Sequence, residues 1–255
     1  MDFKNKVVIV TGGSAGIGAE TAILFANQSA KVVIVGRNEE NLKKVAKQCK
    51  DAKGIEPLVV KADVTIDADV KNIVNATVKH FGQIDVLVNN AGITGENKIQ
   101  DGIDIFDKLI NTNLRSVYLL TSLAVPYLIK TKGNIINISS VAGQKVISKF
   151  LVYCTTKAAL DMLTKGLAKE LGPDGVRVNA ISPGPVKTGI FNASGMDGDA
   201  VIKSREKTSP LGKVAVPKDI ADIILYLASD KANSITENII KLIGTLFYVY
   251  VKTFA

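Results

Sequence analysis

The sequence predicts a single α/β domain over residues 1–255, built as a doubly wound parallel sheet with helices on both faces. Short apolar runs, typical of strands buried on both faces, alternate with longer segments of helical period. Repeated strand–helix units of this kind favour a parallel sheet between two helix layers. The chain has 255 residues and is 47% hydrophobic, so it can bury a large core. No linker, low-complexity tract or internal repeat interrupts the alternation.

The elements follow in order along the chain. The apolar runs predict strands at residues 6–10, 31–35, 55–61, 84–88, 134–138, 176–181 and 239–243. The periodic segments predict helices at residues 17–28, 39–50, 67–81, 103–110, a longer stretch ending at 130, 153–171 and 217–228. The helix from residue 153 is expected to end near Gly172 and Pro173, because both residues stop helices. Residues 183–213 are rich in glycine, serine, proline and charge, which favours a mobile substrate loop over 187–213 that carries a short helix.

Charge and composition exclude several classes of protein. The net charge of +8 is spread along the chain without a run of like charges, so we expect attraction for an anionic cofactor and no nucleic-acid partner. Cys49 and Cys154 lie far apart without metal-ligand spacing, which predicts free thiols in a reducing compartment and no metal site. The polar N-terminus lacks a signal-peptide core, and the apolar run at 242–251 is shorter than the roughly 20 residues of a membrane span. A cytoplasmic protein with no membrane span is therefore predicted.

A glycine-rich turn follows the first predicted strand and opens the first predicted helix, in the run Thr11-Gly12-Gly13-Ser14-Ala15-Gly16-Ile17-Gly18. Glycines there allow a tight turn and let a pyrophosphate approach the start of the helix, where free N–H groups hold the anion. Ordinary turns also use glycine, but placement between strand and helix favours a dinucleotide site.

The end of the second predicted strand indicates which dinucleotide binds. An acidic residue there would accept hydrogen bonds from the ribose of NAD, but the chain has Gly36 followed by Arg37. The planar guanidinium of arginine suits a phosphate, so Arg37, with Ser14, is predicted to bind the 2′-phosphate of NADPH. The alternative is a solvated arginine at a helix start.

Tyr153 and Lys157 lie four residues apart in an apolar-periodic segment, so on a helix they share one face. A phenol has a pKa of about 10, and a neighbouring ammonium is expected to lower the pKa of Tyr153. Tyr153 would then act as an acid or base near neutral pH. The alternative is a surface tyrosine beside a solvated lysine.

Taken together, these motifs resemble the short-chain dehydrogenase/reductase family, in its branch of single-domain enzymes of roughly 250 residues. The resemblance runs from Lys6 to about Ile235, in the family's order and spacing. It rests on Thr11-Gly12-x-x-x-Gly16-x-Gly18, Asn89-Asn90-Ala91-Gly92, Asn113, Ser140, Tyr153-x-x-x-Lys157 and Pro183-Gly184. It implies a Rossmann-like sheet of about seven strands and hydride transfer between a nicotinamide and a carbonyl or alcohol.

The resemblance also implies roles for single residues. The implied catalytic residues are Asn113 (support of a proton-relay water), Ser140 (polarising the substrate), Tyr153 (acid/base) and Lys157 (lowering the pKa of the tyrosine). The predicted cofactor-binding residues are Gly12, Ser14, Gly16, Ile17, Gly18, Arg37, Asp63, Val64, Asn90, Tyr153, Lys157, Pro183, Gly184, Val186 and Thr188. Three of them have plainer alternatives: Asn113 bonded to backbone within a helix, Asp63 as a carboxylate near a helix start, and Asn90 tying strands together.

The C-terminal region departs from the family. Where the family has Ile-Thr-Gly and then a strand closing in Asp-Gly-Gly, this chain has Glu237 in place of the glycine and Ile243 in place of the aspartate. These differences put the seventh strand and the subunit contact it often makes in doubt. The aromatic tail at 246–255 could cover a subunit interface, line the substrate cleft or form a loose end.

The predicted function is NADPH-dependent reduction of a ketone, or the reverse oxidation of a secondary alcohol (EC 1.1.1.-), by a homodimer or homotetramer. Apolar residues in the stretches expected to form the pocket favour a steroid, isoprenoid, lipid or xenobiotic carbonyl, although core packing uses the same residue types. The alternatives are a catalytically idle dinucleotide-binding sensor or scaffold, and a 3-oxoacyl thioester reductase.

Overall fold

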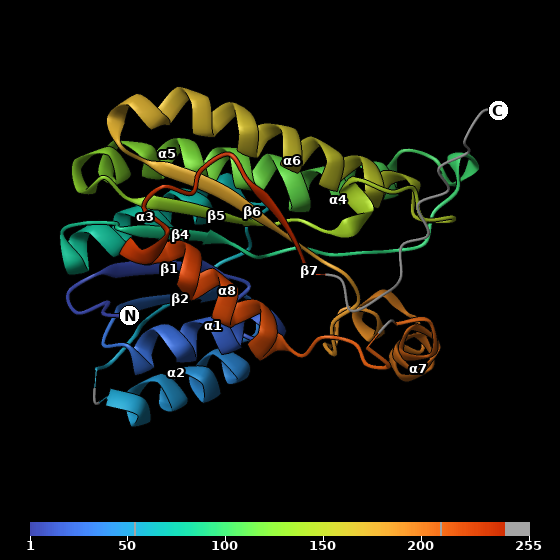
Figure 1. The fold of residues 1–255 in the computed structure, drawn as a ribbon, viewed down its shortest axis with the longest axis horizontal. Coiled ribbons are helices and arrows are strands. Elements are labelled where there is room, and N and C mark those ends of the chain that lie inside the picture. The colour runs from blue at the N-terminus through green and yellow to red at the C-terminus, as the bar shows by residue number, and fades with distance from the viewer. Residues whose placement is uncertain (54, 210, 243–255) are drawn as a thin grey trace.

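A computed structural model describes residues 1–53, 55–209 and 211–242 of the chain (Figure 1). Its strands are β1 (Val7–Thr11), β2 (Lys31–Gly36), β3 (Leu58–Lys61), β4 (Val86–Asn89), β5 (Asn134–Ile138), β6 (Arg177–Pro183) and β7 (Ile239–Leu242). Its helices are α1 (Gly16–Asn27), α2 (Glu39–Lys53), α3 (Asp67–Phe81), α4 (Asp104–Ile110), α5 (Ser116–Thr131), α6 (Leu151–Leu171), α7 (Gly198–Thr208) and α8 (Pro217–Ala228).

The strands of the described residues form one seven-stranded parallel sheet in the order β3-β2-β1-β4-β5-β6-β7. The order reverses between β1 and β4, which run side by side with Val8 paired to Val86. In open sheets of this kind, ligands bind outside the carboxyl ends of the strands at the reversal. The predicted Rossmann-like, doubly wound sheet is confirmed.

Two cores lie on the two faces of the sheet, because successive strand residues point to opposite sides. Val8 and Val10 of β1 join the core under α1, α2 and α8, while Val7 and Ile9 join the core under α3, α5 and α6. Figure 1 shows these two helix layers, with α7 apart from both. Each strand buried in this way needs apolar residues at consecutive positions, which explains the uninterrupted apolar runs of the sequence.

Several boundaries differ from the sequence prediction. β3 begins at Leu58 and not at residue 55, directly after Pro57, which has no N–H to donate to a sheet ladder. α6 begins at Leu151, two residues before Tyr153. α4 and α5 are joined without a break by a π-helical segment, Asn111–Arg115, which the sequence pattern did not predict.

The doubtful last strand is present as β7, which pairs with β6 in parallel register from Ala180–Ile239 to Pro183–Leu242. Glu237 occupies a left-handed conformation, with φ of 63°, and its N–H donates to the carbonyl of Val178. This conformation suits glycine, so the substitution strains the turn without preventing the strand. Ile243 and the aromatic tail at 246–255 lie outside the described residues.

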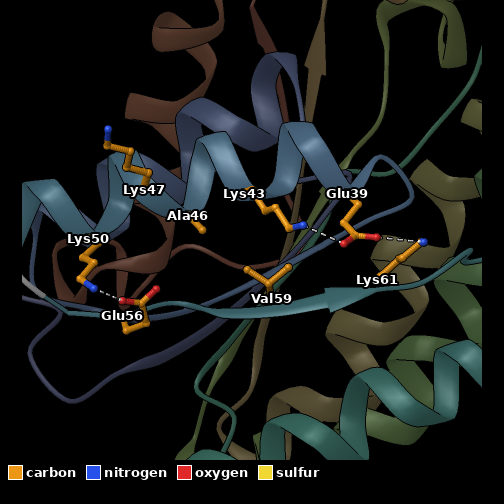
Figure 2. Close-up of a pocket in the computed structure, with 8 residues that line it drawn as sticks. All are labelled: Glu39, Lys43, Ala46, Lys47, Lys50, Glu56, Val59 and Lys61. Carbon is orange, nitrogen blue, oxygen red and sulfur yellow. Dashed lines mark hydrogen bonds and ion pairs between the residues drawn. The ribbon is translucent and has the colours of Figure 1, made fainter.

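An open groove of about 620 Å³ runs along the sheet edge between α2 and β3, and Figure 2 shows the residues that line it. Three of its four lysines form ion pairs: Glu39 pairs with Lys43 at 2.9 Å and with Lys61 at 3.2 Å, and Glu56 pairs with Lys50 at 2.7 Å. These side chains are exposed, so each pair contributes little to stability. None of the predicted catalytic residues lines this groove.

Candidate functional site

The glycine-rich turn after β1 is packed so closely that side chains cannot fit at key positions. Gly12 has a φ of 65°, and a Cβ there would lie 2.8 Å from Nδ2 of Asn90. A Cβ at Gly18 would overlap the carbonyl oxygen of Gly12 and lie 2.5 Å from the same nitrogen. The turn therefore requires glycine at both positions, and it leaves backbone N–H groups at the start of α1 open to an anion. Ser14 and Ile17 belong to the same turn, and Ile17 packs against the core.

Asn90 and Thr11 join the ends of β4 and β1 where the sheet order reverses. Asn90 donates from Nδ2 to the carbonyls of Thr11 at 2.8 Å and Gly12 at 3.4 Å. The Thr11 hydroxyl accepts the N–H groups of Asn90 and Ala91, each at 3.0 Å. The alternative role for Asn90, tying strands together, is therefore what its described contacts show, and its contact with a cofactor stays a prediction.

The segment after β6 lies next to the glycine-rich turn. Gly184 donates its N–H to the carbonyl of Leu242 at 2.9 Å, and Val186 pairs with Ala215 as an isolated bridge. Thr188 then lies against the glycine-rich turn, since a Cβ at Gly16 would meet Cγ2 of Thr188 at 3.2 Å. The structure thus brings together the glycine-rich turn and the stretch that begins at Pro183, although they are far apart in sequence.

Arg37 lies at the end of β2, as expected, and its side chain is 71% exposed. Its guanidinium contacts the Asp63 carboxylate, with Nη1 and Oδ2 separated by 3.4 Å. Partial burial opposes the charge on Asp63, but hydrogen bonds from Thr65 and the charge of Arg37 hold the pKa of its carboxyl below the usual value. Ser14 lies beside this site, because a Cβ at Gly36 would come within 3.0 Å of its hydroxyl oxygen.

Asn113 lies in the π-helical segment between α4 and α5 and is 1% exposed. Its side chain bonds to a different part of the chain: Oδ1 accepts the N–H of Ile93 and Nδ2 donates to its carbonyl, both at 2.9 Å. Nδ2 also lies 3.3 Å from the hydroxyl of Thr156 on α6. These contacts fit the alternative of a helix-interior asparagine bonded to backbone, although that backbone belongs to Ile93 and not to its own helix. The support of a proton-relay water stays a prediction, and the π-helical turn directs Asn113 toward α6.

Lys157 is 5% exposed and donates from Nζ to the carbonyl of Ile138, at the end of β5, at 2.9 Å. A Cβ at Gly92 would lie 3.6 Å from this Nζ and 3.3 Å from Oδ1 of Asn113, so both side chains reach the same place. Burial lowers the pKa of the Lys157 ammonium to about 8, with the charge of Asp161 acting in the opposite direction.

Tyr153 stands one helical turn before Lys157, whose Nζ lies 5.7 Å from the centre of the phenol ring. Burial raises the pKa of Tyr153 above its usual value, and a side-chain hydrogen bond with Ser140 opposes this rise. The expectation that Lys157 lowers the pKa of the tyrosine is therefore wrong for this structure, because burial dominates and the opposing effect comes from Ser140 and not from the ammonium. Ser140 also accepts the N–H of Ala142 at 3.1 Å, which caps the 3-10 turn Val141–Gly143.

The remaining predicted residues lie around this centre. Val64 follows β3 and packs partly into the core beneath α3 and α5. α7 lies within the predicted substrate loop, and Ser194, just before it, donates to the carbonyl of Thr94 at 2.7 Å. Val146 is 78% exposed at the outer side of the Ser140 turn. The Cys154 sulfur faces the segment before α6, where it accepts the N–H of Ile147.

Three residues at the site were missed by sequence reasoning. Thr11 and Thr156 make the hydrogen bonds described above, which depend on contacts between distant segments. Asp161 is 6% exposed and shares a face of α6 with Tyr153 and Lys157. Its spacing of four from Lys157 in a helix with an apolar face is a signal that the sequence did contain.

The part of the chain that the structure describes also bears on metal binding and on membrane spans. Over those residues, no cluster of His, Cys, Asp and Glu side chains could hold a metal ion. No helix among them is both long enough and apolar enough to cross a membrane.

Comparison with known proteins follows this geometry. A family profile described as enoyl-(acyl carrier protein) reductase matches residues 12–242. The chain is 36% identical over 249 residues to a 3-oxoacyl-[acyl-carrier-protein] reductase, FabG, of Thermotoga maritima, covering 96% of this chain and 99% of that protein.

Solved structures agree with these matches. A short-chain dehydrogenase/reductase of Caenorhabditis elegans, solved with cofactor, superposes with a TM-score of 0.89 at 41% identity, covering 95% of each chain. L-sorbose reductase of Gluconobacter frateurii, complexed with NADPH and L-sorbose, gives a TM-score of 0.89 at 29% identity over 96% of this chain and 97% of that one. Together with the glycine-rich turn, these findings show that the chain belongs to the short-chain dehydrogenase/reductase family, oxidoreductases that bind a nicotinamide dinucleotide.

Proposed function

We propose that the protein reduces a carbonyl compound with NADPH, or oxidises the corresponding secondary alcohol with NADP, using Tyr153 as the proton donor and acceptor. The observation that carries this proposal is the convergence of four side chains at the carboxyl ends of β4 and β5. Tyr153 bonds with Ser140, while Lys157 and Asn113 both approach Gly92. A site that only bound a nucleotide would need none of this arrangement around Ser140.

The reaction needs one hydride and one proton. When bound, the dinucleotide supplies the hydride to the carbonyl carbon. The hydroxyl of Ser140 donates a hydrogen bond to the carbonyl oxygen, and Tyr153 transfers its proton to that oxygen as negative charge develops. Because burial raises the pKa of Tyr153, the phenol stays protonated and ready to donate. Lys157 holds a positive charge beside the ring, which stabilises the phenolate that remains.

Residues of the glycine-rich turn, of the strand ends beside it and of the stretch after β6 would hold the dinucleotide. The N–H groups after Gly12 and at the start of α1 suit its pyrophosphate, and Asp63 and Val64 suit the adenine end. Asn90 and the stretch Pro183, Gly184, Val186 and Thr188 would border the nicotinamide. These residues would therefore contact the cofactor along its length.

Arg37 is the residue that favours NADPH over NADH in this proposal. Its guanidinium is largely exposed and touches the Asp63 carboxylate through one contact of 3.4 Å, so most of its donors remain open to a 2′-phosphate. Arg37→Gln should lower kcat/KM for NADPH by about 10- to 100-fold, since a hydrogen bond to a charged group contributes about 1.5–3 kcal/mol. It should leave kcat/KM for NADH within about threefold.

Lys61→Gln is the matched control, because Lys61 is another exposed cation at this edge of the sheet and pairs with Glu39 (Figure 2). Lys61→Gln should leave kcat/KM unchanged for both NADPH and NADH. Equal losses for both cofactors in Arg37→Gln, or better efficiency of the wild type with NADH, would remove Arg37 from the proposed role.

The substrate proposed is an apolar ketone of a steroid, isoprenoid, lipid or xenobiotic. Val146 and Leu151 support this class, because they lie between Ser140 and Tyr153 in the sequence and are 78% and 44% exposed, so core packing does not use them. The assay is oxidation of NADPH with a panel of such ketones, with sugars and with 3-oxoacyl thioesters. A preference for sugars would overturn the substrate class while leaving the reaction type intact.

A 3-oxoacyl thioester is the second candidate substrate. It is favoured by the 36% identity to a relative named as a 3-oxoacyl-[acyl-carrier-protein] reductase, over nearly the full length of both chains. The same panel distinguishes the two candidates by kcat/KM. An idle sensor or scaffold would bind NADPH and turn over none of the panel.

The protein is further proposed to act as a homodimer or homotetramer in the cytoplasm. Exposed apolar side chains on the outer faces of α5 and α6, such as Tyr118 at 62% and Met162 at 67%, support association with a second copy. Sedimentation at several protein concentrations tests the oligomeric state.

A further inference from the structure

Asp161 is a buried acid for which the proposed reaction has no direct use. It follows Lys157 by four residues and Tyr153 by eight on α6, so the three side chains lie along one helix face. Asp161 is 6% exposed. A carboxylate at such a depth is costly unless hydrogen bonds and opposite charge compensate it.

The partners of Asp161 lie on both sides of Ser140 in the sequence. Nε2 of Gln144 donates to Oδ2 at 3.3 Å, and the Ser139 side chain also forms a hydrogen bond with the carboxyl. Oδ1 is buried and accepts no hydrogen bond from the described residues. The carboxyl thus connects α6 to the residue before Ser140 and to the end of the turn that follows it.

The backbone of that turn is pressed directly against α6. A Cβ at Gly143 would lie 2.9 Å from Oδ2 of Asp161 and 2.8 Å from the carbonyl carbon and oxygen of Lys157. The single proton of the Ser139 hydroxyl goes either to the Asp161 carboxyl or to this Lys157 carbonyl, which lies 3.3 Å away, so in both cases Ser139 bonds to α6. Ser140 therefore sits on a turn whose two ends are tied to the helix that carries Tyr153, and its hydroxyl direction depends on those ties.

Asp161 also acts on the charge of the site. Among the described residues, Asp161 is the group whose charge acts on Lys157, and Lys157 and Lys165 are the cations that act on Asp161. The elements packed against this face supply neutral groups: Ser139 and Gln144 from the Ser140 turn, and Ile138 from β5. The carboxylate favours the protonated form of Lys157, which opposes the effect of burial.

We propose that Asp161 is a positioning residue for the reaction, which clamps the turn carrying Ser140 onto α6 and supplies the negative charge behind the Lys157 ammonium. The role rests on the proposed function, because Ser140 and Lys157 need to be positioned only if Tyr153 transfers a proton. It is carried by the two-sided hydrogen bonding and the close approach of Gly143, and it makes Asp161 part of the site without contact with substrate or cofactor.

The test compares four variants by the pH dependence of kcat. Asp161→Asn keeps the shape and one acceptor oxygen but removes the charge, so the pH at which kcat falls on the alkaline side should move down by about one unit. Ser139→Ala keeps the charge and weakens the clamp, so kcat should fall about 3- to 10-fold with that pH unchanged. Asp161→Ala removes both and should show both effects. Lys169→Gln, further along the same helix and 73% exposed, should leave the wild-type profile.

A second measurement keeps the test available where turnover is weak or Asp161→Ala does not fold. The NMR signal of the Lys157 ε-carbon, in protein containing ¹³C-labelled lysine, reports its titration without catalysis. In Asp161→Asn the midpoint should move to lower pH, and in Ser139→Ala it should stay. An unchanged midpoint and an unchanged pH profile in Asp161→Asn would overturn the role of Asp161.

The failure of the proposed function would look different. A wild-type protein that turns over no carbonyl, or a Tyr153→Phe variant with wild-type kcat, would overturn the proposed function whatever Asp161→Asn does. An active wild type whose Tyr153→Phe variant is inactive, with Asp161→Asn unaltered, would overturn only the inference about Asp161.

Discussion

Replacing Lys157 with methionine should make the free energy of unfolding depend less on pH in the alkaline range. Methionine keeps a flexible apolar stem and removes the buried ammonium. The pKa of Lys157 falls from 10.5 to about 8 in the folded protein because of burial, although Asp161 opposes the fall. A difference of about 2.5 units corresponds to about 3 kcal/mol of free energy of unfolding, at about 1.4 kcal/mol per unit.

The sign follows from proton binding in the two states. Below pH 8, Lys157 is protonated in both the folded and the unfolded chain, so the full cost of burying the ammonium is present. Between pH 8 and 10.5 the unfolded chain binds more protons, so the stability of the wild type rises with pH. Lys157→Met lacks this group, so its free energy of unfolding should not rise in this window. The difference between the two proteins should therefore change by about 2 kcal/mol or more from pH 7 to pH 10.

The measurement is urea unfolding at equal protomer concentration, followed by far-UV circular dichroism because the chain has no tryptophan. The loss of the hydrogen bond to Ile138 shifts the variant by about 1–3 kcal/mol at every pH, so the slope with pH is the informative quantity. Lys165→Met, which removes an exposed lysine from the same helix, should follow the wild type. If the curves of Lys157→Met and wild type stayed parallel within about 0.5 kcal/mol, the buried ammonium would not have a depressed pKa.

Four other predictions concern activity, binding and stability. Tyr153→Phe should lower kcat by about 10²- to 10⁴-fold with NADPH affinity kept, and a stopped assay that found more than about a tenth of the wild-type rate would contradict its role. Carbonyl reduction by the wild type should decline as pH rises through about 8, where Lys157 loses its proton. A reduction rate that does not change up to pH 10 would show that protonated Lys157 is not required. Asn90→Ala removes the donor to the carbonyls of Thr11 and Gly12, so it should cost about 1–3 kcal/mol in urea unfolding and weaken NADPH binding measured by fluorescence; unchanged values for both would show that the turn holds itself. Glu237→Gly should stabilise the protein by about 1 kcal/mol by relieving the left-handed backbone at φ of 63°, and a lower urea midpoint would show that the pair with Lys169 outweighs the strain.

The sheet could be predicted from the sequence because each buried strand must be apolar at consecutive positions. The strand pattern of the first, second and fifth runs leaves little freedom, and the structure follows it closely. The third strand was predicted too long because the apolar run was extended through Pro57, whose missing N–H excludes it from the sheet ladder. The seventh strand forms in spite of Glu237, because its ladder with β6 depends on backbone groups that any residue supplies.

The candidate site was predictable only where one local segment carries it. The glycine-rich turn and the Tyr153–Lys157 spacing are local patterns, so the sequence indicates them directly. Contacts between distant segments are not written in any local pattern. Asn113 meets Ile93 and Thr156 through the π-helical turn, and Arg37 meets Asp63 across two strand ends.

The direction of the Tyr153 pKa was predicted wrongly for the same reason. Sequence spacing identifies the neighbouring ammonium but not the depth at which the pair is buried. Burial acts in the same sense on the three ionisable groups of this helix face: it raises the pKa of Tyr153 and Asp161 and lowers that of Lys157. Each group is thereby pushed toward its neutral form. The push is opposed by Ser140 at Tyr153, by the charge of Asp161 at Lys157, and by Ser139, Gln144 and two lysines at Asp161.

This balance explains why stability and activity should conflict on α6. Three ionisable groups lie at spacings of four, with Lys157 and Asp161 buried and Tyr153 partly buried, where apolar side chains of similar size would pack at lower cost. The free energy lost there brings the pKa of Lys157 to about 8, close to physiological pH, where a change of protonation can occur during turnover. Apolar substitutions on this face of α6 should therefore stabilise the protein at neutral pH only by removing Lys157, which the proposed turnover requires. Relief of backbone strain at Glu237, which is not one of the proposed site residues, should instead stabilise the protein with kcat unchanged.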